Sequence, residues 1–207
     1  MFKMYQKDNL KLFVGVVEGD PIRIERDDGL IVMITLKDYQ NERIKIYFRN
    51  NRTTRQEMRA DRIINAKVCD GTFLTVLATC SDPKEESATG LDFKFRGCWK
   101  FKTEGDKYTS VIMGVACRPR APADGMFCIT IPLDEYENGK IVTKWIDVSF
   151  YDTDGKGEAR KCAAFASRVL HGTDRPWVAV CGGSIKTSEY KDKLVYSMIG
   201  YRITRRP

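Results

Sequence analysis

The sequence predicts an all-β protein built from two copies of one small domain. Short segments that are rich in β-branched and aromatic residues, and that alternate apolar with polar positions, recur along the chain as is typical of strands. Segments of the first half reappear in the same order about one hundred residues later. Each half also holds one segment with helical spacing, at the same place in the order. The 207 residues, 43% of them hydrophobic, suffice for packed cores.

Five pairs of segments carry the internal repeat. In order, they are LFVGVVEGDP (12–21) with VIMGVACRPR (111–120), ITL (34–36) with ITI (129–131), RIKIYFRN (43–50) with WIDVSFYD (145–152), TFLTVLATC (72–80) with PWVAVCGG (176–183), and LDFKFRG (91–97) with LVYSMIG (194–200). The last pair aligns two terminal glycines and the alternating residues Phe93 and Phe95 with Tyr196 and Met198, which we expect in the cores. Five matches in one order indicate duplication. The polar segment TEGDK (103–107) places the boundary between domains 1–104 and 105–207.

Each half is predicted to contain three strands, one helix and two further strands. The second half offers GEARKCAAFASRVL (157–170), with one apolar face formed by Cys162, Phe165, Ala166 and Val169. The first half offers TTRQEMRADRIINAK (53–67), with a weaker face formed by Ala60, Ile63 and Ile64. This plan matches the OB-fold, a five-stranded Greek-key barrel, here with a helix between strands three and four. Two unrelated β-sandwiches are the alternative, but they do not account for a lone helix at the same place in both halves.

The third strand of each half has one apolar and one functional side. Ile44, Ile46 and Phe48 alternate with the other positions and are expected in the core, as are Ile146, Val148 and Phe150 in the second copy. The outward set is Arg43, Lys45, Tyr47 and Arg49 in the first copy, and Trp145, Asp147, Ser149 and Tyr151 in the second. Cations neutralise phosphates, and flat rings stack on unpaired bases of any sequence. The strand pattern therefore favours binding of single-stranded nucleic acid.

Further basic and aromatic residues extend this candidate surface. Seven Arg and Lys residues against two acidic ones lie between positions 43 and 62, in a chain with a formal net charge of +7. Loop tyrosines with lysines near them are candidate base stackers, although ordinary exposure explains them nearly as well. The additional candidates are Arg52, Arg55, Tyr39, Tyr136, Tyr190, Lys144, Lys186 and Lys191. For Trp145 and Tyr151 the alternative is a subunit interface or cover from a loop.

Catalysis, cofactors and metals are not expected. The seven cysteines form no C-x-x-C pair, and the lone histidine, His171, lies in a turn-like segment. Asp27-Asp28 and Asp134-Glu135 lack partner carboxylates, and DTDGKGE (152–158) departs from the calcium-loop spacing. The sequence contains no eighteen-residue apolar run and no apolar signal segment, so no membrane association is expected and the expected location is cytoplasmic.

The second half resembles the bacterial single-stranded DNA-binding protein family. The resemblance covers about residues 108–205 and rests on KWIDVSFYD, CAAFASRVL and PWVAVCGGSIKTSEYKDKLVYSMIGYRI. It implies stacking roles for Trp145, Tyr151, Tyr136 and Tyr190, and sequence-independent binding of single-stranded DNA in replication, recombination or repair. It also implies a homodimer that presents four OB-folds, and a phage or mobile-element form fits the divergent tandem arrangement. The ending IGYRITRRP lacks the family's acidic recruitment peptide. A protein-interaction module and a single-stranded RNA binder remain alternatives.

Overall fold

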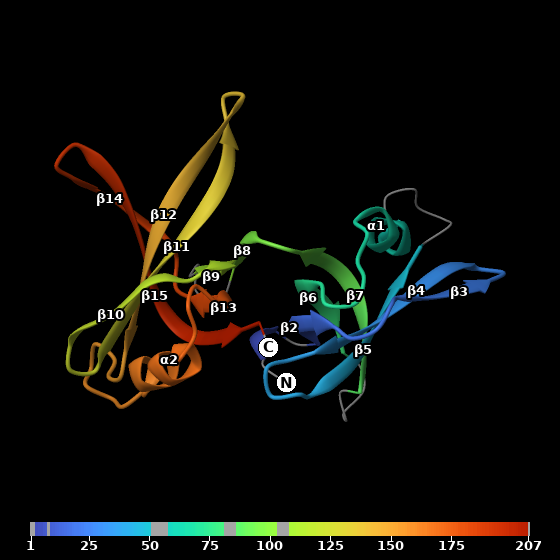
Figure 1. Cartoon of the computed structure of the whole chain (residues 1–207), viewed down its shortest axis with the longest axis horizontal. Helices are drawn as coiled ribbons and strands as arrows, with labels where there is room; N and C mark the ends of the chain where they lie inside the picture. The colour runs from blue at the N-terminus through green and yellow to red at the C-terminus, as the bar shows by residue number, and fades with distance from the viewer. Residues whose placement is uncertain (1–2, 8, 51–57, 81–85, 103–107, 207) are drawn as a thin grey trace. The chain divides into compact units, whose positions relative to one another are not determined.

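The chain is mostly β and forms two sheets with two helices among the residues described. The structure is a computed structural model that describes residues 3–7, 9–50, 58–80, 86–102 and 108–206 (Figure 1). Contacts divide the chain into two compact units. The N-terminal unit is Met1–Phe95 with Arg206–Pro207, and the C-terminal unit is Arg96–Arg205. No helix in the described ranges is long and apolar enough to span a membrane.

This division falls earlier in the chain than the predicted boundary between residues 104 and 105. Strand β8 (Gly97–Lys102) pairs antiparallel with β9 (Tyr108–Val115), which joins it to the sheet of the C-terminal unit. The predicted boundary itself lies in 103–107, outside the described residues.

Five strands of the N-terminal unit close into a ring. Its elements are β1 (Lys3–Lys7), β2 (Leu10–Val17), β3 (Ile22–Arg26), β4 (Gly29–Lys37), β5 (Arg43–Arg49), α1 (Arg59–Asn65), β6 (Phe73–Thr79) and β7 (Ser87–Lys94). The sheet order is β1-β2-β6-β7-β5-β4-β3, and β2 also pairs with β4, so β2, β4, β5, β7 and β6 form the ring. The β5–β7 pairing is parallel, and α1 lies between β5 and β6 in the chain.

The C-terminal unit repeats this arrangement with longer hairpins. Beyond β8 and β9 it contains β10 (Cys117–Ala123), β11 (Met126–Glu137), β12 (Lys140–Tyr151), α2 (Cys162–Leu170), β13 (Trp177–Gly182), β14 (Lys186–Tyr190) and β15 (Lys193–Arg205). The order is β10-β11-β12-β15-β13-β9-β8, with β12 and β15 parallel and β14 paired to β15. Strands β9 and β11 are also in contact. The β11–β12 and β14–β15 hairpins extend away from α2 (Figure 1).

One pair of glycines occupies equivalent close approaches in the two units. A Cβ on Gly15 of β2 would lie 2.2 Å from the Lys37 carbonyl oxygen of β4. A Cβ on Gly114 of β9 would lie 2.8 Å from Cγ2 of Ile131 on β11. In the N-terminal unit β2 therefore crosses β4 too closely for a side chain, and in the C-terminal unit β9 crosses β11 in the same way. The predicted alignment of these two segments agrees with this geometry.

A second pair corrects the predicted alignment of the last strands. A Cβ on Gly90 would lie 2.4 Å from Cε1 of Phe48, and one on Gly200 would lie 2.4 Å from Cε1 of Phe150. Gly90 is thus the counterpart of Gly200, whereas the predicted counterpart, Gly97, opens β8 with a φ of 117°. The alignment of 91–97 with 194–200 was wrong in register.

The predicted inward side of the third strand is confirmed in both units. Ile44, Ile46 and Phe48 are at most 1% exposed, and Ile146, Val148 and Phe150 are at most 2% exposed. The four residues expected in the cores at the last strands behave differently from one another. Phe93 and Met198 are buried, Tyr196 is half-buried, and Phe95 is 38% exposed, so the core expectation for Phe95 was wrong.

Both helices are shorter than predicted. Residues 157–161 precede α2 and are not helical, and among them Gly157 and Lys161 have φ values of 81° and 56°. Residues 53–57 lie outside the described part of the chain. In both units a polar residue at the end of strand three accepts a hydrogen bond from an N–H group in the first turn of the helix. Asn50 Oδ1 accepts from the Ala60 N–H at 2.9 Å, and Asp152 Oδ1 accepts from the Ala164 N–H at 3.0 Å. These two residues end the aligned segments 43–50 and 145–152, which explains why both segments close on a polar residue.

Gly200→Ala is expected to destabilise the C-terminal unit by about 1–3 kcal/mol, because the added methyl group must displace the buried Phe150 ring. Urea unfolding measures this change. Gly155→Ala is the matched control, since a Cβ there meets no atom within 4 Å. Equal unfolding midpoints for the two variants would contradict the packing described.

Candidate nucleic-acid interface

The outer face of β12 presents two aromatic rings to solvent. Trp145 is 48% exposed and Tyr151 is 38% exposed, while Ile146, Val148 and Phe150 lie in the core. Successive side chains on a strand point to opposite faces, so the alternation separates rings from core. The exposure of Trp145 and Tyr151 follows the predicted parity. Their role in binding stays a prediction at this point.

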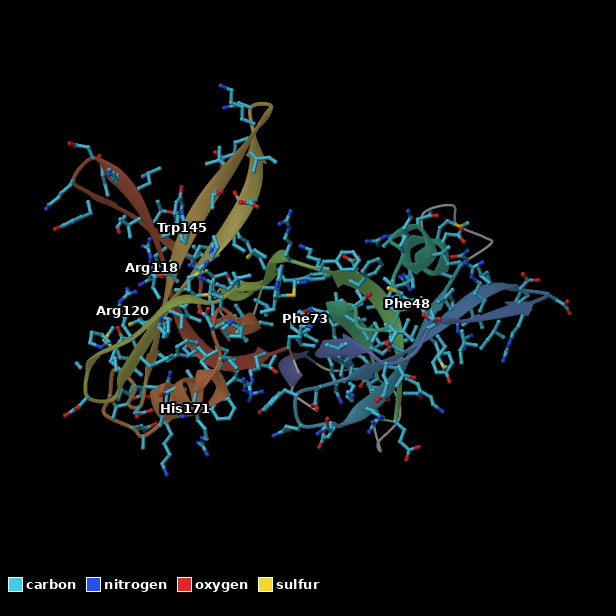
Figure 2. All side chains as sticks on the ribbon, viewed as in Figure 1. Phe48, Phe73, Arg118, Arg120, Trp145 and His171 are labelled. Atoms are coloured by element: carbon cyan, nitrogen blue, oxygen red, sulfur yellow. The ribbon has the colours of Figure 1, made fainter. Side chains whose placement is uncertain are left out.

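An arginine that the sequence analysis missed lies over Trp145. Arg118 comes from the edge strand β10, and its guanidinium carbon is 5.2 Å from the centroid of the Trp145 ring (Figure 2). This is a cation–π contact. Arg118 has a φ of 52°, and the pairing of β10 with β11 has irregular register on either side of Arg120. The signal in the sequence was CRPRAPA (117–123), with two arginines among prolines.

A second missed arginine balances a carboxylate on the same face. Asp147 lies between Trp145 and Tyr151 in the outward set of β12. The Thr130 hydroxyl donates to Asp147 Oδ1 at 2.6 Å, and Arg120 Nη2 lies 3.6 Å from the same oxygen. A bare carboxylate would repel phosphates, and this pairing offsets that charge. The face therefore keeps Arg118 as a cation beside the Trp145 ring.

The β14–β15 hairpin presents Tyr190 and its lysines. Tyr190 is 64% exposed, and the ammonium of Lys191 lies 5.3 Å from its ring centroid. Lys191 and Asp192 form the two-residue connection with φ values of 48° and 58°, as a type I′ hairpin turn requires. Lys186 is exposed at the start of β14. The predicted exposure of this hairpin tyrosine is confirmed.

Lys144 is engaged within the β11–β12 hairpin. Its ammonium bonds Glu135 Oε2 at 2.6 Å and Glu137 Oε1, and lies 5.5 Å from the Tyr196 ring centroid. The hydrogen bonds that the Lys144 ammonium donates to Glu135 and Glu137 raise the pKa of Lys144 above its ordinary range. A phosphate would have to displace these carboxylates, so the predicted phosphate contact at Lys144 competes with a structural one. The side chain of Tyr136 lies outside what the structure describes.

Arg43 in the N-terminal unit is likewise paired. Its Nε and Nη2 donate to the two carboxylate oxygens of Glu18 at 2.5 and 2.8 Å, and Lys37 Nζ lies 3.3 Å from Glu18 Oε1. Hydrogen bonding from Arg43, the largest cause, holds the pKa of Glu18 at about 2, below its ordinary value of 4.5. Arg43 therefore already has a counter-ion, and the argument from repulsion between adjacent cations on β5 does not apply to it. Its contact with nucleic acid stays a prediction.

The remaining basic and aromatic candidates of this unit divide into two groups. Lys45 and Arg49 are exposed on β5, and within the described ranges neither forms an ion pair. Tyr47 lies between them and is half-buried. Tyr39, also half-buried, lies in the turn after β4. Arg52 and Arg55 fall outside the described residues. Of the residues that can be placed, Lys45, Tyr47 and Arg49 thus form the open part of this face.

The Glu18–Arg43 pair gives a pH prediction. Because the folded-state pKa of Glu18 is lowered, its contribution to stability is present above about pH 4.5 and is lost as pH falls toward about 2. The difference in urea midpoint between the wild type and Glu18→Gln should therefore shrink over that window. Glu25→Gln, which removes an exposed carboxylate of β3, is the control. A difference that is independent of pH would contradict the pairing.

The residues that could hold a metal do not gather in the described part of the chain. No group of three or more His, Cys, Asp or Glu side chains meets there, and all seven cysteines are free thiols. The DTDGKGE segment forms a turn in which Asp154 Oδ1 accepts from the N–H groups of Lys156 and Glu158 at 2.8 and 2.9 Å. These bonds lower the pKa of Asp154, with that from Glu158 the larger cause. The turn accounts for the acidic spacing without an ion.

Comparison with known proteins assigns no family. No protein-family model matches the chain, and no curated protein matches it. Among solved structures, one similar chain comes from "Structure and Conformational Change of a Replication Protein A Heterotrimer Bound to ssDNA", with 11% identity over 97% of this chain and a TM-score of 0.28. This chain spans about half of that chain's length, since the match covers 49% of it. A TM-score of 0.28 is too low to establish a shared fold.

Proposed function

We propose that each unit is an OB-fold and that the chain binds single-stranded DNA without sequence preference. The ring order of the N-terminal unit supports the fold. Its strands one to five are β2, β4, β5, β6 and β7, with strand three parallel to strand five and a helix between strands three and four. Five-stranded Greek-key barrels of this kind bind oligonucleotides on the face of strands two and three. In the C-terminal unit that face is β11 and β12.

The observation that carries the proposal is the solvent-exposed Trp145 on that face with Arg118 held over it. A base needs a flat ring to stack on, and its phosphate needs a cation close to that ring. Trp145 and Arg118 supply both at one place. Tyr151 lies six residues further along the same strand face, about 20 Å away at the usual rise. The two rings therefore mark a path along β12.

Stacking of a base on Trp145 requires the Arg118 side chain to move. Its guanidinium covers a ring face at 5.2 Å in the unbound protein. A base that stacks on this face displaces the guanidinium, which is then free to contact a phosphate. The cation–π contact thus shields the exposed indole in the absence of DNA and releases a cation in its presence.

The two units contribute differently. The N-terminal unit offers Lys45 and Arg49 around a half-buried Tyr47, which suits phosphate contact more than stacking. The C-terminal unit offers Trp145, Tyr151 and Tyr190, which suit stacking. Rings and phosphate contacts read no base edges, and this explains binding without sequence preference.

A role in replication, recombination or repair and a homodimer that presents four barrels rest on the family resemblance of the second half. The proposed cytoplasmic location and the proposed lack of catalysis rest on the sequence patterns described above. Analytical ultracentrifugation with and without oligo(dT) tests the dimer directly, and a monomer under both conditions would contradict it.

Salt-dependent binding tests the function. Fluorescence anisotropy with oligo(dT), a duplex of equal length and oligo(U), each over a range of salt concentrations, is expected to show tightest binding to oligo(dT). The log–log salt dependence should have a slope of about −0.7 for each phosphate contacted. Equal affinity for duplex and single strand would contradict the proposal, and tighter binding to oligo(U) would replace DNA with RNA.

A further inference from the structure

A pocket opens where the outer face of β12 ends. It has a volume of about 330 Å³ and is lined by Tyr151, Thr153, Asp154, Gly155, Arg160, Cys162, Ile199, Gly200 and Tyr201. Pockets for small ligands begin at about 300 Å³. The volume therefore suits a ligand of about the size of one nucleobase. Tyr151 belongs both to the pocket and to the stacking face, so the two are continuous.

Two tyrosines from neighbouring parallel strands line this pocket. Phe150 of β12 is in register with Gly200 of β15, so the residues that follow them, Tyr151 and Tyr201, point to the same outer side. They are 38% and 41% exposed. Ile199, on the same side of β15, is 45% exposed and adds an apolar wall. Surfaces of this kind accept the faces of a flat heterocycle.

An anchored cation stands at the rim. The Arg160 guanidinium carbon lies 5.7 Å from the centroid of the Tyr201 ring, and its Nη2 lies 3.2 Å from Asp154 Oδ2. The other oxygen of Asp154 accepts two backbone N–H groups. The Asp154 carboxylate is therefore engaged in contacts within the protein. Arg160 is held against the Tyr201 ring, and its remaining N–H donors can bind an anion.

We propose that this pocket receives one base turned out of the bound strand, stacked against Tyr151 and Tyr201, with its phosphate on Arg160. The inference rests on the proposed single-strand binding and adds a defined subsite at the end of the Trp145–Tyr151 path. Trp145 offers a base a single ring, whereas the pocket offers rings from two neighbouring strands and the apolar side chain of Ile199.

The test uses short oligo(dT) strands in which a single 2-aminopurine replaces thymine at each position in turn. Stacking quenches 2-aminopurine fluorescence, and anisotropy of a labelled end reports binding independently. One position is expected to lose its quench in Tyr201→Ala while the others keep theirs, with affinity reduced about five- to tenfold. Tyr201→Phe keeps the ring and should retain both the quench and the affinity.

Arg160→Gln provides a second variant that leaves both rings in place. It should reduce the magnitude of the salt slope by about 0.7, one phosphate contact. If wild-type protein binds oligo(dT) but every position keeps its quench in Tyr201→Ala, the pocket is not a base site and the general binding function stands. If the wild type does not bind oligo(dT) at all, the proposed function fails and the subsite fails with it.

Discussion

Replacing Trp145 with alanine is expected to weaken oligo(dT) binding by about five- to a hundredfold, the range for loss of one stacked base. The indole is 48% exposed, and its ring is covered by Arg118. The variant removes the stacking surface and leaves the core side of β12 intact. Anisotropy titration measures the loss of affinity, and Trp145→Phe should recover part of it because a smaller ring remains.

Folding should be almost unaffected by the same change. The change removes the cation–π contact with Arg118, worth about 0.5–1 kcal/mol at an exposed site, and the packing of the covered part of the ring, but it leaves the core residues of β12 in place. Ile22→Ala, at another exposed apolar side chain, should change neither affinity nor Tm appreciably. A Tm loss for Trp145→Ala as large as that of Phe150→Ala would show that the indole is part of the core.

Removing Lys45 and Arg49 together is expected to flatten the salt dependence of binding. Each phosphate contact contributes about 0.7 to the log–log slope, so the double variant Lys45→Ala/Arg49→Ala should reduce its magnitude by about 1.4 and lower the affinity at low salt. Both side chains are exposed on β5. Anisotropy titrations at four or more salt concentrations measure the slope.

Arg43→Ala is the matched control for this prediction. Arg43 lies on the same strand face, but Glu18 holds it through two hydrogen bonds of 2.5 and 2.8 Å. Its removal should leave the slope nearly unchanged. If Arg43→Ala flattens the slope as much as the double variant does, then the Glu18 pair opens on binding and the division between paired and open cations is wrong.

Strand parity was predictable from the sequence because it depends only on local alternation. Ile44, Ile46 and Phe48 could be assigned to the core side of β5 without knowing any strand partner. In the same way, Trp145 and Tyr151 could be assigned to the outer side of β12. The β-rich composition and the repeated order likewise predicted two sheets with a helix at the same place in each half.

Contacts between distant segments were not predictable in the same way. Arg118 reaches Trp145 because β10 pairs with β11 and β11 with β12, and irregular register along β10 sets where each arginine falls. The pairing of Arg43 with Glu18 joins residues that are 25 positions apart. Neither partner stands out in the local sequence, so Arg118 was missed and Arg43 was treated as an open cation.

The register error at the last strands has a topological cause. The C-terminal unit inserts the hairpin strand β14 before β15, and the described part of the N-terminal unit has no such strand between β6 and β7. A constant offset therefore fails there, and Gly97 was aligned with Gly200 in place of Gly90. The packing of each glycine against the phenylalanine of strand three reveals the correct pair.

Intrinsic tryptophan fluorescence tests the binding face most directly. The chain has three tryptophans; Trp99 is buried and Trp177 half-buried, so Trp145 is the exposed reporter. Titration with oligo(dT) should quench the wild-type emission, a duplex of equal length should quench it much less, and Trp145→Phe should abolish most of the change. A full quench that persists in Trp145→Phe would contradict the assignment of β12 as the surface that binds DNA.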